Sequence, residues 1–262
     1  MQYLIENYGA VGGSIFFLLI QTLRYVLFAG VLFVPFYILW KKKWWHRNIQ
    51  QKLPAIQKIK HEIIHSLQSI VILLAFGWMI YFLKINGFTL IYTEIAEYGW
   101  LYLIFSTFAL IFIHDTYFYW THRLMHHKKL FRWFHKTHHH SQNPTPWASL
   151  SFHPLEALVE FAIAPIIVFI MPLHPLALFI FATLSMGMNV IGHLGFEIFP
   201  RGFTKHWLGS WQNTATHHNM HHQLVNCNYG LYFNFWDKWM GTNHKNYLDK
   251  FDEITSRKPT SN

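Results

Sequence analysis

Long apolar segments restrict this chain of 262 residues to folds that are stable in a lipid bilayer. A helix needs about 20 mostly apolar residues to cross the hydrocarbon core. Apolar segments of about this length lie at residues 22–40, 66–83, 100–120, 156–171 and 176–194. The fourth is short for a full crossing, and the two prolines at 172–175 predict a hairpin with the fifth. We therefore expect an all-α integral membrane bundle of about four to five transmembrane or hairpin helices.

The composition supports this class and argues against nucleic acid as a partner. Apolar residues make up 52% of the chain and charged residues only 13%, which is low for a soluble protein. Aromatic residues reach 19%, and Trp and Tyr favour membrane interfaces. The net charge is +9, but no basic helix or aromatic-basic face suggests nucleic-acid binding. We expect the acidic partner to be the cytoplasmic leaflet.

The basic residues predict an orientation. With the N-terminus outside, every Lys and Arg except Arg24 and Lys84 falls on one side of the membrane, and the opposite loops carry Glu94 and Glu97. Loops rich in Lys and Arg stay in the cytosol. The segments expected there are 41–65, 121–155 and 195–262. We expect a protein of the bacterial inner membrane or the endoplasmic reticulum, with a helical cap on the cytosolic side.

The two ends of the chain give simpler expectations. The N-terminus lacks the pattern of a cleaved signal peptide, so the first apolar segment should be retained. Arg24 should snorkel to the interface, and Pro35 should kink the helix. The polar tail after Asp249 should be loosely ordered.

A single cysteine, Cys227, excludes a cysteine-based zinc or iron–sulfur site.

Histidines gather in three blocks at helical spacing. Residues three and four apart share one face of a helix, and imidazole is the commonest metal ligand in proteins. The blocks contain His122 and His126; His135, His138 and His139; and His218, His221 and His222. Three such blocks in one chain are a strong indication of a transition-metal site.

A ninth candidate is His193, at the cytosolic end of the last apolar segment. His127 and His140 extend their blocks but point off the shared faces, so they are weaker candidates. Nine imidazoles are too many for one ion, because a catalytic zinc takes about three protein ligands. Two ions could share the nine ligands and keep coordination positions open for oxygen or water. Ligation by nitrogen alone does not suit Mg or Ca.

Three further residues are candidates to support the ligands. Asp115 lies seven residues before His122, on nearly the same helical face, and could accept an N–H from a ligating imidazole. Asn189 lies one turn before His193, and its amide could reach the site through water. His217 directly precedes the third block.

The ordered motifs resemble the fatty acid hydroxylase / sterol desaturase superfamily, in particular its sterol desaturase-type members. They read DTYFYWTHRLMHH at 115–127, HKTHHH at 135–140 and HHNMHH at 217–222. FHPLE at 152–156, the Asn189–His193 spacing and NYGLYFNFWDKWMGT at 228–242 also match. The resemblance covers residues 100–242, which we take as the catalytic region of a single membrane domain, 1–262. Asn219 stands where many members have an acidic residue.

The resemblance implies an enzyme with a non-haem di-iron centre held by these nine histidines. Such enzymes use O2 as co-substrate and two electrons to hydroxylate or desaturate a C–H bond of a membrane lipid, such as a sterol, fatty acyl chain or ether lipid. The chain has no His-Pro-Gly-Gly or GxGxxG motif, so we expect a separate electron donor, ferredoxin- or cytochrome b-type with its reductase. An acidic donor would dock on the basic face.

Two other functions are considered. A zinc-dependent membrane hydrolase would need HExxH or a general-base carboxylate beside the ligands, and no such motif is present. A metal transporter should place its ligands at mid-membrane in broken helices, whereas these histidines lie at or beyond the ends of the apolar segments. Nothing in the sequence separates hydroxylation from desaturation.

Overall fold

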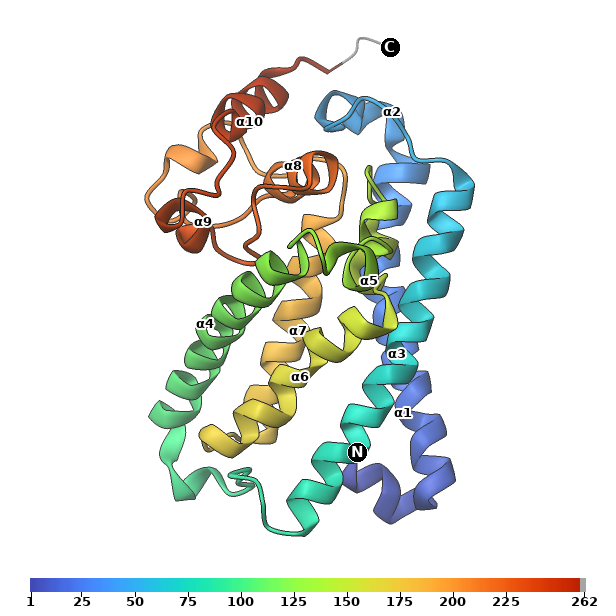
Figure 1. Cartoon of the computed structure of the whole chain (residues 1–262), viewed down its shortest axis with the longest axis vertical. Coiled ribbons are helices and arrows are strands. Elements are labelled where there is room, and N and C mark those ends of the chain that lie inside the picture. The colour runs from blue at the N-terminus through green and yellow to red at the C-terminus, as the bar shows by residue number, and fades with distance from the viewer. Residues whose placement is uncertain (260–262) are drawn as a thin grey trace.

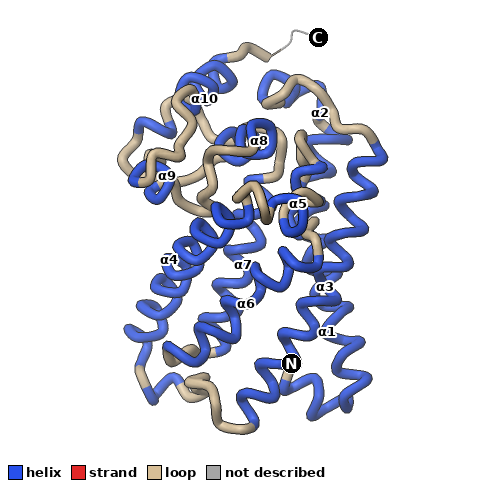
Figure 2. The backbone as a smooth tube through the Cα atoms, in the orientation of Figure 1, coloured by secondary structure: helices blue, strands red, loops and turns tan. Residues whose placement is uncertain are grey.

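The computed structural model describes residues 1–259, which form helices, loops and isolated β-bridges but no strand (Figure 2). The prediction of an all-α fold is therefore confirmed. The five long helices are α1 (Gln2–Phe33), α3 (Ile56–Ile85), α4 (Gly99–Met125), α6 (Pro154–Ile170) and α7 (Pro175–Gly192). The short ones are α2 (Lys41–Trp44), α5 (Phe131–Phe134), α8 (Ala215–Leu224), α9 (Phe235–Trp239) and α10 (Tyr247–Ser256).

Four helical segments are long and apolar enough to cross a membrane: Gln2–Leu39, Ile56–Ile85, Gly99–Met125 and Pro175–Gly192. The fifth long helix, α6, has 17 residues and packs against α3 and α4. This agrees with the expectation of four to five transmembrane or hairpin helices. The chain is an integral membrane protein.

The first helix is longer than predicted. It begins at Gln2 rather than near residue 22, and Gly9, at φ 69°, bends its first turns. The expected distortion at Pro35 takes the form of a π-helix over Val34–Leu39. Trp40 N–H donates to the Pro35 carbonyl at 2.8 Å, which is the i to i+5 pairing of a π-helix, and its acceptor is a residue that has no N–H of its own to donate.

Arg24 does not snorkel as expected. Its Nη2 donates to the Ala182 carbonyl on α7 at 2.6 Å, and its Nη1 donates to Gln21 Oε1 at 3.2 Å. Because α1 begins some twenty residues earlier than predicted, Arg24 lies well inside the helix and not at its end. The guanidinium therefore ties α1 to α7, with a backbone carbonyl as its partner.

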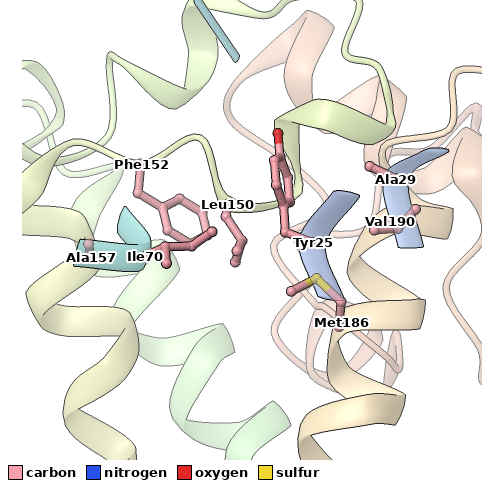
Figure 3. Close-up of a cluster of buried hydrophobic side chains, with 8 residues drawn as sticks. All are labelled: Tyr25, Ala29, Ile70, Leu150, Phe152, Ala157, Met186 and Val190. Carbon is pink, nitrogen blue, oxygen red and sulfur yellow. The ribbon is translucent and has the colours of Figure 1, made fainter. Parts of the chain in front are cut away.

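The apolar core encloses the segment that follows the second histidine block (Figure 3). Its buried members come from α1, α3, α6, α7 and the loop before α6: Tyr25, Ala29, Ile70, Leu150, Phe152, Ala157, Met186 and Val190. The hydroxyls of Tyr25 and Ser66 both donate to the Trp147 carbonyl, at 2.8 and 2.9 Å. In a bilayer this packing stabilises the bundle through van der Waals contact, because lipid tails are as apolar as these side chains. The core thus fixes the loop that leads out of the histidine blocks.

The short helices α2, α5, α8, α9 and α10 gather at one end of the bundle, and the α3–α4 loop lies at the other (Figure 1). The three basic segments predicted to share one face therefore share one end. The tail was expected to be loosely ordered after Asp249; this is wrong for α10, which continues to Ser256, and residues 260–262 lie outside the described part of the chain. Tyr247, Phe251 and Ile254 are buried on one side of α10, a helical spacing that the polar composition of the tail conceals.

Candidate metal centre

The nine predicted ligands converge in two groups at the capped end of the bundle. The five-histidine cluster is His122, His126, His135, His139 and His221, and the four-histidine cluster is His138, His193, His218 and His222. Within each cluster one ring nitrogen of every residue lies within 4.8 Å of the others, and all nine side chains are buried. His127 and His140 belong to neither cluster. The structure therefore brings together every residue that the sequence nominated as a ligand, except those two weaker candidates.

The sequence blocks do not correspond to the clusters. The second block was expected to form one helical face, but α5 ends at Phe134 and a separate 3₁₀ turn covers His138–His140. His138 and His139 enter different clusters, with an interplanar angle of 87° between their rings. On α8, His221 joins the five-histidine cluster, whereas His218 and His222 join the other. Helix α8 therefore serves both clusters.

Five of the nine imidazoles are oriented through Nδ1 by an acceptor outside the clusters. The Nδ1–acceptor pairs are His122 with the Tyr229 carbonyl at 2.8 Å, His135 with Glu156 Oε1 at 2.6 Å, His138 with the Ser151 carbonyl at 3.2 Å, His193 with the Asn189 carbonyl at 2.8 Å and His221 with the Cys227 carbonyl at 2.7 Å. A carbonyl can only accept, so Nδ1 carries the proton and Nε2 keeps its lone pair. This arrangement is typical of metal-binding histidines.

The Nε2 atoms face one another at distances that require a cation. His193 Nε2 lies 3.2 Å from His138 Nε2, and both rings donate their Nδ1 proton to carbonyls. Two lone pairs at this distance repel each other unless a positive ion lies between them. Two nitrogens that each bind one metal at about 2.1 Å and at right angles lie about 3 Å apart. The donor set therefore fits a metal ion in each cluster.

Three cluster histidines outside the spanning helices, His139, His193 and His221, are neutral near pH 7. Burial lowers the pKa of His193 to about 4 and, together with neighbouring imidazoles, the pKa of His139 to about 3. Burial and the adjacent His122 also hold the pKa of His221 well below its usual value. Neutral imidazoles are the form that binds transition metals, and no proton has to be removed before binding.

The loop between α8 and α9 holds the first block in place. Asp237, which is fully buried, accepts from the backbone N–H groups of Tyr229 and Gly230, both at 2.8 Å. A Cβ at Gly230 would lie 2.3 Å from the Phe233 carbonyl, so this turn needs glycine. The position of the Tyr229 carbonyl, which orients His122, therefore depends on Asp237. The role of Asp237 was not predicted from the sequence, where the available signal was a carboxylate within an aromatic segment.

The three supporting residues act differently from expectation. Asp115 does not meet an imidazole; its Oδ1 accepts from the N–H groups of Tyr232 and Phe233, at 2.7 and 3.3 Å. Seven residues carry it about 10 Å along the helix from His122, too far for contact. Asn189 orients His193 with its backbone carbonyl, while its side chain donates to Ser149. His217 lies 3.7 Å from Asp237.

Glu156 is a further supporting residue, and the FHPLE motif at 152–156 did not reveal its role. It lies in the first turn of α6 and is 1% exposed. Its Oε1 meets His135 Nδ1 at 2.6 Å, and its Oε2 has no hydrogen-bond partner among the described residues. A carboxylate behind a ligating imidazole raises the basicity of the imidazole and fixes its orientation.

Known proteins share this arrangement of motifs. Residues 107–242 match the family model described as fatty acid hydroxylase. The chain is 34% identical over 198 residues to Delta(7)-sterol 5(6)-desaturase ERG3B of Gibberella zeae, covering 75% of this chain and 59% of that protein. It is 30% identical over 165 residues to lathosterol oxidase of Rattus norvegicus, covering 62% and 54%.

A further relative, cholesterol 25-hydroxylase of Mus musculus, is 33% identical over 123 residues, which is 45% of this chain and 40% of that protein. The chain thus spans between two fifths and three fifths of the length of these three relatives. No solved structure matches this chain.

Proposed function

Because this chain belongs to the fatty acid hydroxylase family, we propose that it is a membrane oxidoreductase that oxidises a C–H bond of a lipid with O2 and two electrons. The observation that carries the proposal is the pair of buried, all-histidine clusters at one end of an apolar bundle. We propose iron as the metal, one ion in each cluster. Two iron ions would supply the redox chemistry that activates O2.

The protein's own contribution is to hold and shield this centre. The imidazoles offer neutral Nε2 donors, and the carbonyls behind them keep each ring in one tautomer. Phe152, 6% exposed, lies with its ring centroid 5.4 Å from that of His138. Such apolar walls exclude water from the reacting carbon. Both clusters consist of histidines alone, and the carboxylate beside them, Glu156, is paired with His135 Nδ1 at 2.6 Å; this favours oxidation over zinc-dependent hydrolysis, which needs a general base that can reach water.

We propose a sterol-like lipid as the substrate and desaturation as the reaction. The names of two of the relatives above denote oxidation of a sterol ring, and these two cover more of the chain than cholesterol 25-hydroxylase does. The substrate would reach the centre from the bilayer, since the clusters adjoin the ends of α4 and α7. We place the centre on the cytosolic side, because the basic segments lie at the same end of the bundle.

This function is tested by incubating membranes that contain the chain with a Δ7-sterol, an electron donor and ¹⁸O2. Desaturation gives a product that has lost two hydrogen atoms and carries no label, whereas hydroxylation leaves one ¹⁸O in the lipid. Mass spectrometry of the extracted sterols separates the two outcomes. Activity of a preparation that holds only zinc would contradict the proposal.

The electron donor is proposed to dock over a cavity of about 250 Å³ in the capped end, lined in part by Lys52, Lys58 and His140. His140 directly follows the cluster residue His139, so the cavity adjoins the centre along the chain. Gln50, also in the lining, donates to Asn219 on α8 at 2.9 Å. Residues 41–61 and 121–155 contain no acidic residue. An acidic ferredoxin or cytochrome b-type protein would complement this surface.

Reversing the charge at the cavity, Lys52→Glu with Lys58→Glu, should lower donor-supported turnover about tenfold at low ionic strength, because steering of an acidic partner is lost. Steady-state rates at increasing salt, with the protein donor and with dithionite, measure the effect. The same charge reversal at Lys84, on the opposite end, is the control. An equal loss with dithionite would show that the substitutions damage the centre and not the docking of a donor.

A further inference from the structure

The start of α3 carries a further sequence with metal-binding spacing. Residues 61–65 read HEIIH, so the expectation that the chain lacks an HExxH motif is wrong. Glu62 is fully buried and accepts from Thr145 Oγ1. Within residues 1–259, neither His61 nor His65 belongs to a histidine cluster. The motif therefore offers no carboxylate that could activate water beside a metal, and we assign it no metal site.

The loop before α8 and helix α9 expose large apolar side chains next to one another. Trp207 is 71% exposed and Trp239 is 62% exposed. The two segments are joined by the Asn234 N–H, which donates to the Trp211 carbonyl at 2.9 Å, and by Lys238, whose Nζ lies 4.6 Å from the centre of the Trp211 ring. We call these exposed residues the aromatic patch: Trp207, Leu208, Trp211, Trp239 and Met240.

A row of aromatic rings links the aromatic patch to α4. Phe112 on α4 stacks on Phe233, with ring centroids 5.2 Å apart and an angle of 14° between the planes. The Phe233 ring lies 5.9 Å from that of Phe235, and the Phe235 ring lies 5.1 Å from that of Trp239. Trp239 of the patch is therefore connected to a residue of a spanning helix through rings in contact.

This row reaches the part of α4 that spans the membrane. Phe112 lies thirteen residues before the end of α4 at Met125, which is about 20 Å along the helix axis. Phe105 and Phe108 continue the exposed apolar surface away from the cap. Figure 1 shows α9 beside the capped end of α4. The aromatic patch is thus continuous with the surface that α4 turns toward lipid.

The chemistry of the patch fits the boundary between lipid headgroups and acyl chains. Trp favours this region, whereas irregular loops do not face lipid within the hydrocarbon core. The only acidic residue between positions 198 and 248 is Asp237, which is fully buried. Arg201, Lys238 and Lys245 are exposed. Exposed cations beside a membrane attract anionic headgroups.

We propose that the aromatic patch inserts into the membrane leaflet on the capped side, so that α9 lies in the plane of the interface. The partner of this surface is the same bilayer that the spanning helices contact. Insertion would hold α9 against the leaflet, and Asp237 on α9 accepts from the N–H of Tyr229, whose carbonyl orients His122. The membrane surface would thereby support one wall of the metal centre, whatever reaction that centre performs.

Nitroxide spin labels at two patch positions test the insertion. Trp207→Cys and Trp239→Cys are prepared in the full chain, labelled, and reconstituted into vesicles of phosphatidylcholine and phosphatidylglycerol. Cys227 is buried and should stay unlabelled, which the wild type checks. Relaxation of each label by O2 and by a water-soluble nickel chelate should place it about 5–10 Å below the lipid phosphates.

Leu248→Cys is the matched control. Leu248 is also a large, exposed apolar residue, but it lies on α10, which is farther from α4 than α9 is (Figure 1). Its label should therefore be fully accessible to the nickel chelate. Metal content equal to that of the wild type shows that each labelled protein is folded.

Two results would overturn the insertion. The first is a label at position 207 or 239 that is as accessible to the nickel chelate as the label at position 248. The second is broadening of the spectral lines that disappears on dilution with unlabelled chain, because it would show that a second copy of the chain covers the patch.

Discussion

Replacing His193 by alanine should reduce the bound metal from about two ions per chain to about one and abolish turnover. His193 Nε2 lies 3.0 Å from His218 Nε2 and 3.2 Å from those of His138 and His222, so it contacts every other member of the four-histidine cluster. Without its ring, only three imidazoles of the cluster remain, and the end of α7 supplies no ligand. Elemental analysis of the purified protein and the sterol oxidation assay measure the two effects.

The matched control is His46→Ala. His46 belongs to neither cluster and lies in the short 3₁₀ turn after α2, so both metal content and turnover should stay at wild-type levels. Size-exclusion chromatography in detergent checks that both variants remain folded. Wild-type metal content in His193→Ala would remove the four-histidine cluster from the proposed centre.

Removing the Glu156 carboxylate should weaken metal retention or activity about 10- to 100-fold, the usual effect of losing a group that orients a ligating histidine. Glu156→Ala leaves His135 Nδ1 without the acceptor that now lies at 2.6 Å. The ring can then rotate, and its Nε2 no longer points toward the other nitrogens of the cluster. Glu156→Gln should have a smaller effect, because the amide oxygen still accepts. The rate of metal loss to a chelator measures the difference.

Glu253→Ala is a suitable control for the removal of an acid. Glu253 is exposed on α10, where it pairs with Lys250 and Arg257 at 2.9 and 2.7 Å. Exposed pairs of this kind contribute little, so metal retention should not change. Equal retention in Glu156→Ala and the wild type would show that His135 is held by its ring packing alone.

The membrane class and the donor set follow from residue types in the sequence. Apolar segments of spanning length can form only a helical bundle or a closed barrel in lipid, and the basic loops mark one end. Eight of the nine imidazoles could be nominated because their spacing repeats in three blocks, and His193 because it ends the last apolar segment. Spacing predicts best where a regular helix continues, as it does for His122 and His126 in the last turn of α4.

Only the tertiary structure decided how these residues divide and what supports them. The neighbours His138 and His139 enter different clusters, as do His221 and His222 on the continuous helix α8, because the cluster that each ring joins depends on which distant segments pack beside it. The acceptors behind the rings come from distant segments; the Tyr229 carbonyl lies 107 residues from His122. Backbone carbonyls are present at every position and leave no mark in the sequence. Residue chemistry therefore predicted a histidine metal site, and chain packing decided that the nine imidazoles form two clusters.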